Sequence, residues 1–477
     1  CSSDLRFWSA ARTEINCDPN FPYLQETRWL PNYDRTMSYL GLTADLTSWA
    51  NAAKTLYSSN GHTQSQGGTG GAPEIGLIPG YYMGFVYGAG AAASWDLLMG
   101  RADMAFAYPL RFRCGIAQRS GVTRYYDDQN LVASIGRLAS RDAYRTNSMR
   151  DGASAINAQA SSADLFTIIG SRAANSWSQE GAHFGDPNFL PYIMTGDYAY
   201  LEQSQAWAHW TTFQLYPGTA SYESGRDPRD CIGDTGQVRA FGWQMRNRGT
   251  CRAICPDNSP ERAYWTRIFA NHFKKEQGWL GATGYASDPI SLYWFQNRPS
   301  RYTSNPLSFI HYSSNREGLG VNGYDDVAPF MVLFCTASAW WLTSMGEPVP
   351  SWYNTTIDDW WKKLHDYDWR YTMNYRIPAT SGTSDANQQF YQTWASAFPV
   401  GYNVTIDGPG EIVYAHGYAR YAAGTFSVGK DIGLPGATAI FANVSTKTFV
   451  DGDKWFPIDT VGSGSTAQNP LWAIAPR

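Results

Sequence analysis

The hydrophobic pattern of the chain predicts α-helices that follow one another in pairs. Apolar residues recur at intervals of three and four positions in several segments of helical length, and short stretches rich in Gly, Pro, Asn and Ser separate these segments. Each such helix has an apolar face that a partner must cover, and consecutive pairs do this in helical toroids and solenoids. We therefore expect an all-α fold. The predicted helices span residues 44–57, two within 75–98, 161–174, 197–213, 236–248, 260–275, 325–345 and 357–375.

The last part of the chain has a different composition. Residues 401–477 are rich in Gly, Val, Thr and Ile, and while 411–425 has a helical pattern, 439–456 is compatible with strands. We predict a helical toroid over 71–400, followed by a closing hairpin or a small β-rich segment over 401–477. An N-terminal segment with the first helix occupies 1–70, with a remnant of a larger N-terminal region as one interpretation of it.

Composition narrows the class of protein. The 477 residues are 43% hydrophobic and only 16% charged, below the usual quarter or so. Aromatic residues reach 15%, and Trp and Tyr offer flat apolar faces with a polar handle, which suit sugar rings. A net charge of −4 without a run of Lys or Arg argues against nucleic-acid binding. No apolar run reaches the length of about 18 residues that a transmembrane helix needs.

The seven cysteines indicate an extracytoplasmic protein. We predict a disulfide among Cys231, Cys251 and Cys255, which is typical of oxidising compartments. Cys335, in an apolar helix, is expected to be a buried free thiol. The start at Cys1 resembles the first residue of a mature bacterial lipoprotein, with a domain start as the alternative. Secreted, periplasmic and surface-anchored locations all remain open.

Chemistry is concentrated in residues 178–202, SQEGAHFGDPNFLPYIMTGDYAYLE. This segment combines a histidine, acidic groups, an asparagine and a proline with an aromatic run that is compatible with a helix. A helix that lines a cleft needs such a mixture, because one face packs while the other holds polar groups within reach of a ligand. Asp197, after Gly196, is interpreted instead as the cap of the next helix.

Several segments resemble uncharacterised bacterial proteins with a six-hairpin (α/α) toroid. AHFGDPNFLPYIMTGDYAYLE at 182–202 is similar to their histidine, loop, "PYLLTGD" and Tyr-rich helix, and GDTGQVRAFGWQMRNRG at 233–249 is similar to the next hairpin. Residues 323–326, GYDD, open a Trp-rich helix as a third match. The resemblance covers roughly 70–477 and implies a toroid related to polysaccharide lyases and inverting glycoside hydrolases. The chain departs from the pattern at Phe184-Gly185-Asp186 and in its extra cysteines.

The first functional hypothesis is a lyase that cleaves a uronic-acid-containing polysaccharide by β-elimination. His183 is the candidate base, because imidazole titrates near neutral pH, and Tyr192 is the candidate proton donor. Guanidinium and amide groups would neutralise the uronate carboxylate. Helical spacing places Arg239, Trp243 and Arg246 on one face. The candidates for holding the carboxylate are Asn188, Gln237, Arg239, Arg246 and Asn247.

The second hypothesis is an inverting glycoside hydrolase, which needs two separated carboxyl groups. Glu180 or Asp186 would pair with Asp325 or Asp326, although Asp325 and Asp326 also suit a helix N-terminus. The third is a non-catalytic glycan-binding or structural surface subunit that self-assembles as a homo-oligomer. We expect a polysaccharide partner and no cofactor, with a structural divalent cation such as calcium as an open alternative. Further candidates for contact with substrate are Tyr324, His311 and His416.

Overall fold

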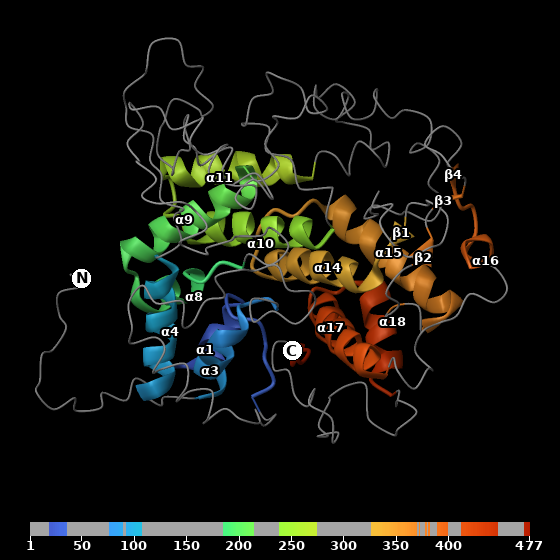
Figure 1. Cartoon of the computed structure of the whole chain (residues 1–477), viewed down its shortest axis with the longest axis horizontal. Helices are drawn as coiled ribbons and strands as arrows, with labels where there is room; N and C mark the ends of the chain where they lie inside the picture. Colours follow the sequence, from blue (N-terminus) through green and yellow to red (C-terminus); the bar gives the residue numbers. More distant parts are fainter. Residues whose placement is uncertain are drawn as a thin grey trace, which may run out of the picture. The chain divides into compact units, whose positions relative to one another are not determined.

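The computed structural model describes the chain mostly as α-helices (Figure 1). The described residues are 19–35, 76–88, 92–106, 185–213, 238–273, 326–369, 372, 377–378, 380–381, 389–398, 412–446 and 472–477. The helices are α1 (Phe21–Glu26), α3 (Met83–Tyr87), α4 (Ala92–Ala105), α8 (Phe189–Thr195), α9 (Tyr198–Phe213), α10 (Val238–Ile254), α11 (Pro260–His272), α14 (Pro329–Ser344), α15 (Ser351–Tyr367), α16 (Trp394–Ala397), α17 (Ile412–Asp431) and α18 (Pro435–Val444), with the 3₁₀ turn η1 (Gly80–Tyr82). The strands are β1 (Asp326–Val327), β2 (Ile377–Pro378), β3 (Thr380–Ser381) and β4 (Gln389–Phe390).

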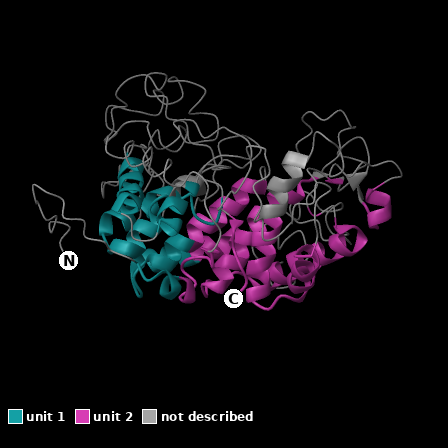
Figure 2. Cartoon of the chain, turned by 90° about the horizontal axis from the view of Figure 1, so that it is seen from below, with its two compact units in different colours: residues 1–24, 39–229, 250–266 teal, residues 25–38, 230–249, 267–477 magenta. Residues whose placement is uncertain are grey.

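The chain divides into two compact units, which are coloured separately in Figure 2. Unit 1 consists of residues 1–24, 39–229 and 250–266, and unit 2 of residues 25–38, 230–249 and 267–477. Each unit is described by itself below. In the parts of the chain that are described, no helix combines the length and the apolar character that crossing a membrane requires.

In unit 1, short helices pack in consecutive pairs. Helices α3 and α4 contact each other, as the Gly/Ala-rich pattern predicted, and α8 contacts α9. Gly196 ends α8 in the left-handed conformation at φ 68°, where a side chain would be strained, and Asp197 Oδ1 then accepts the backbone N–H of Ala199 at the start of α9. The phenol of Tyr200 donates to Asp103 Oδ1 at 2.7 Å, which ties α9 to the end of α4.

Helices α10 and α11 form an antiparallel hairpin. Their connection contains a turn at 256–259, in which the backbone N–H of Ser259 donates to the carbonyl of Pro256 at 3.1 Å. Arg252 Nε donates to Thr266 Oγ1 at 2.9 Å, close to the turn, and Arg248 lies 2.8 Å from His272 Nδ1, farther from it. From the first contact to the second, the position on α10 moves back from 252 to 248 while the position on α11 moves forward from 266 to 272. The two helices therefore run in opposite directions.

In unit 2, α10 and α14 lie side by side and run in the same direction. The backbone of Cys335 lies 3.0–3.1 Å from where a Cβ on Gly242 would be, and the side chain of Leu342 lies 2.6 Å from the same position on Gly249. From the first contact to the second, the position moves forward by seven residues on both helices, from 242 to 249 on α10 and from 335 to 342 on α14. The two helices are therefore parallel. The two glycines allow the approach, because any side chain there would overlap α14.

Helix α17 continues this arrangement on the other side of α14. Phe334 contacts Tyr421 at 5.2 Å between ring centroids, and Trp340 contacts Phe426 at 6.2 Å. The partners again advance together, so α14 and α17 are parallel. We call α10, α14 and α17 the parallel layer, and their first residues define its N-terminal end.

Helix α15 returns antiparallel to α14. Asn354 Nδ2 donates to Thr343 Oγ1 at 2.8 Å, and Trp361 Nε1 donates to Thr336 Oγ1 at 3.0 Å. Helix α18 packs against both α17 and α15. Asp358 of α15 accepts the backbone N–H groups of Gly436 and Ala437, at 2.9 and 2.7 Å, and so caps the start of α18.

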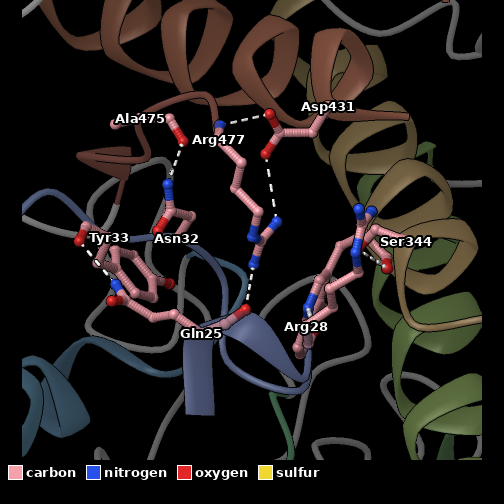
Figure 3. Close-up of polar contacts among 9 residues, drawn as sticks. Gln25, Arg28, Asn32, Tyr33, Ser344, Asp431, Ala475 and Arg477 are labelled. Atoms are coloured by element: carbon pink, nitrogen blue, oxygen red, sulfur yellow. Dashed lines mark hydrogen bonds and ion pairs between the residues drawn. The ribbon is translucent and has the colours of Figure 1, made fainter. Parts of the chain in front are cut away.

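The residues at 472–477 pack into the same unit beside the segment that starts at Gln25 (Figure 3). Asn32 and Ala475 exchange two hydrogen bonds of 2.9 Å, one from the Asn32 side chain and one from the Ala475 backbone. The guanidinium of Arg477 donates to Asp431 Oδ2 at 3.2 Å and to the carbonyl of Gln25 at 2.6 Å. This clasp joins the start of unit 2, its last residues and the end of α17.

The structure corrects some predicted elements. Residues 439–444 are the end of α18 and not a strand, because Ala437, Ile440, Phe441 and Val444 form one buried helical face. Pro435, in the first turn, starts that helix. The predicted helix at 325–345 starts only at Pro329, since residues 326–327 are extended and pair with β2.

The other boundary corrections are smaller. Helix α15 covers Ser351–Tyr367 instead of 357–375, and α10 continues past residue 248 to Ile254. The helices predicted at 44–57 and 161–174 lie outside the described residues.

Candidate functional site

The polar face that the sequence predicted on α10 is present and buried. Arg239, Trp243, Arg246 and Asn247 expose 3% or less of their surface. They lie on one side of the helix, because Arg239, Arg246 and Asn247 are each three or four residues from Trp243. The guanidinium carbon of Arg246 lies 4.1 Å from the centre of the Trp243 ring, a cation–π contact in a dry environment.

On the other side of α10, a further arginine contacts α11. Arg248 is fully buried and lies 2.8 Å from Nδ1 of His272. A guanidinium only donates, so Nδ1 is the acceptor and a neutral His272 carries its proton on Nε2. The His272 ring also packs on Phe241 at 4.1 Å between centroids. The spacing of residues along the chain did not indicate this pairing of His272 with Arg248.

The parallel layer brings candidate residues from three separate hairpins to its N-terminal end. Arg239 is the second residue of α10, Asp326 lies in β1 just before α14, and His416 lies in the second turn of α17. Trp243 contacts Phe334 at 5.3 Å between ring centroids, so the starts of α10 and α14 are also level with each other. In Figure 1, β1 and β2 lie at this end of unit 2. This convergence is the strongest spatial feature among the candidates.

A separate group of candidates lies where α8 begins in unit 1. Asp186 Oδ1 accepts the backbone N–H of Asn188 at 2.8 Å and its side-chain amide at 3.4 Å, and both residues are buried. Tyr192, one turn further on, is partly exposed, and burial raises its pKa, with smaller contributions from Cys255 and Tyr198. Tyr192 therefore keeps its proton well above neutral pH, as a proton donor requires.

Of the three cysteines in the predicted disulfide, Cys231 lies outside the described residues, and Cys251 and Cys255 are not bonded to each other. Cys251 and Cys255 are both free thiols at the end of α10, and both are buried. Positions four apart on a helix have Cβ atoms about 5–6 Å apart, whereas a disulfide needs about 3.5–4.5 Å. Burial, followed by a hydrogen bond with Cys255, raises the pKa of Cys251 well above its usual value. Cys335 is a buried free thiol, as predicted.

The remaining candidates have no described side chains. His183, Glu180, Gln237, His311, Tyr324 and Asp325 lie outside the described residues, and only the backbone is described for Asp326 and His416. Within the described residues, no group of three or more His, Cys, Asp or Glu side chains is arranged to hold a metal ion.

Comparison with known proteins adds no family: no family model, no curated protein and no solved structure matches this chain. The function is therefore argued from the residues themselves. The described candidates form two groups, Asp186, Asn188 and Tyr192 in unit 1 and the α10 face in unit 2.

Proposed function

We propose that the protein is an extracytoplasmic polysaccharide lyase that cleaves a uronic-acid-containing glycan, built as an (α/α) toroid. The toroid is supported by unit 2. There the first helices of the hairpins α10–α11, α14–α15 and α17–α18 are parallel neighbours, while α15 runs antiparallel to α14. Repeating this arrangement around an axis produces an inner ring of parallel helices inside an outer ring.

One observation carries the functional proposal: the backbone positions of Arg239, Asp326 and His416, from three hairpins, lie at the same end of the parallel layer. Binding sites need groups that converge from separate elements onto one place. This end also receives the positive ends of three helix dipoles, which favour an anionic substrate. Arg239 would bind the uronate carboxylate, and its burial would strengthen that ion pair.

The other α10 residues have a positioning role in this proposal. Arg246 lies seven residues after Arg239, so about 10 Å further along the helix axis. Its contact with the Trp243 ring orients both side chains and supports the face behind Arg239. Asn247, fully buried, belongs to this supporting layer.

The proton transfers are assigned to His183 and Tyr192. His183 would remove the proton at C5, beside the carboxylate, and Tyr192 would protonate the leaving glycosidic oxygen. Support for Tyr192 is its partial exposure, which leaves the phenol within reach of a ligand. Asn188, held by Asp186 one turn before Tyr192, would fix the substrate next to this donor.

The proposal is tested by incubating the protein with acidic and neutral polysaccharides while reading ultraviolet absorbance of unsaturated uronates and new reducing ends. We expect both signals to rise on an acidic glycan. Tyr192→Phe should lower kcat by about 10²–10⁴-fold. Tyr23→Phe, at an exposed tyrosine of unit 1, is the matched control and should retain full activity. Wild-type kinetics in Tyr192→Phe would reject the assigned donor.

Glycoside hydrolysis is the second candidate, and the position of Asp326 at the N-terminal end of the parallel layer favours it. Asp325 or Asp326 would then pair with Glu180 or Asp186. Reducing ends without unsaturated product would select this reaction. Neither signal on any glycan, from a folded protein, would favour the glycan-binding or structural subunit.

A further inference from the structure

Tyr367, the last residue of α15, presents an exposed aromatic ring in unit 2. Its side chain lies at the surface with 44% exposure, and the other large apolar residues with comparable exposure in the described parts, Tyr23 and Tyr198, belong to unit 1. An exposed ring by itself is ordinary packing. What distinguishes Tyr367 is the support beneath the ring and its place in the fold.

The ring of Tyr367 is the outermost of a column of nearly parallel rings. Phe398 lies 5.7 Å away between centroids with an angle of 16°, and Trp394 lies 6.0 Å beyond Phe398 with an angle of 22°. Trp394 in turn contacts the buried Trp360 of α15 at 6.5 Å. The orientation of the exposed ring is therefore set by the core, which lowers the entropy lost when a ligand stacks on it.

A capped turn fixes the other half of this column. Thr393 and Ser396 form a reciprocal capping box at the start of α16, the helix that carries Trp394. Thr393 Oγ1 accepts the backbone N–H of Ser396 at 3.1 Å. Phe398 follows directly after α16, so its ring is held close to a rigid turn.

The topology brings Tyr367 to the same end of unit 2 as the candidate site. Helix α15 is antiparallel to α14, with Asn354 opposite Thr343 and Trp361 opposite Thr336. Continuing this register places Tyr367 level with the first turn of α14, at the N-terminal end of the parallel layer. Strand β2, which follows α15 in the chain, pairs with β1 at this end as well.

The charges near Tyr367 select the kind of sugar. Asp366 and Asp368 flank it in the chain, and the nearby lysines are engaged with carboxylates, Lys362 with Asp366 and Lys363 with Asp359. A helix C-terminus also carries partial negative charge. Because Lys362 and Lys363 are already paired with carboxylates, neither is left to bind a uronate, and the ring favours an uncharged pyranose.

We infer that Tyr367 is a stacking subsite for a neutral sugar residue of the glycan that binds at the N-terminal end of the parallel layer. The inference rests on the proposed function and narrows its substrate to a heteroglycan that contains both uncharged and uronic-acid residues. The neutral sugar stacks on the ring of Tyr367, while Arg239 binds the uronate.

The test is affinity electrophoresis of the whole protein in native gels that contain galactomannan, mixed-linkage β-glucan or alginate. Wild type should be retarded by a neutral polysaccharide. Tyr367→Ala should weaken this binding by about tenfold, because a stacking contact contributes on the order of 1 kcal/mol. Tyr367→Phe keeps the ring and should bind within about twofold of wild type.

Tyr23→Ala is the matched control, since it removes an even more exposed tyrosine from the other unit. Near-ultraviolet circular dichroism checks that the tryptophans beneath Tyr367 keep their packing in each variant. The subsite is rejected if no neutral polysaccharide retards wild type, if Tyr367→Ala binds like wild type, or if Tyr23→Ala loses as much binding. The gels measure binding and not cleavage. A protein that cleaves no glycan but needs Tyr367 to bind one would therefore reject the proposed lyase activity and leave the subsite standing.

Discussion

The parallel layer carries the functional proposal, and Gly429 tests the layer directly. A Cβ at this position of α17 would lie 2.4 Å from Cζ3 and 2.5 Å from Cε3 of Trp340, and 2.6 Å from Cβ of Ala437. Carbon atoms in contact prefer about 3.5–4.0 Å. Gly429→Ala therefore requires a shift of about 1 Å in Trp340, which is fully buried, or in one of the helices.

Two opposing terms determine the expected loss of stability. An extra methyl group in a packed core costs about 1–3 kcal/mol, and the overlap on two sides places Gly429→Ala near 3 kcal/mol. Alanine is favoured over glycine within a helix by about 1 kcal/mol. We expect the free energy of unfolding to fall by about 2 kcal/mol.

Urea titration of wild type and Gly429→Ala measures this loss. Trp340→Phe provides the matched background, because phenylalanine lacks the indole carbons that would overlap the new methyl group. In that background Gly429→Ala should cost less than about 1 kcal/mol, so the two changes should be strongly non-additive.

The outcome also decides whether α14 and α17 are in contact. A neutral or stabilising Gly429→Ala, or the same cost in both backgrounds, would refute the close approach of α17 to Trp340. The N-terminal ends of α14 and α17 would then no longer be required to meet, and the convergence of Asp326 and His416 would lose its basis.

Two further predictions concern polar contacts in unit 2. Asp358→Asn should lower the free energy of unfolding by about 1–3 kcal/mol, because it replaces one of the two oxygens that accept the N–H groups of Gly436 and Ala437 with an NH2 group, which only donates. Burial raises the pKa of Asp358, so the folded state binds the carboxyl proton more tightly than the unfolded state does. The stability that this proton contributes is fully present below the ordinary pKa of 3.8 and is lost as pH rises through the raised pKa. Urea titrations at pH values across this interval should show the loss of stability in wild type but not in Asp358→Asn. An equal loss in both proteins would contradict the assignment to Asp358. Arg477→Ala should lower stability by about 1–3 kcal/mol, since it leaves the buried carboxylate of Asp431 without its guanidinium. Thermal unfolding checks this, with Arg477→Lys as the charge-conserving control, and an unchanged Tm in Arg477→Ala would exclude a stabilising clasp.

Part of the candidate site could be predicted because it is local. A helix fixes which residues share a face, so the spacing of Arg239, Trp243, Arg246 and Asn247 was sufficient to place them together. The pairing of Arg248 with His272 could not be found in this way, because Arg248 lies eight residues before the turn at 256–259 and His272 lies thirteen residues after it. What spacing could not supply was the burial of all these side chains.

Errors occurred where distant residues decide the local structure. Residues 439–444 have a composition that suits a strand, yet their apolar positions are covered as a helical face in α18.

The sequence by itself determined where most of the described helices lie, their order in pairs and which residues share each face, because these depend on the 3.6-residue period and on Gly and Pro at the ends. Only the tertiary structure decided that α10, α14 and α17 run parallel, that Tyr367 tops an aromatic column and that Arg477 clasps Asp431. These features rest on contacts between residues tens to hundreds of positions apart, which periodicity along the chain does not encode.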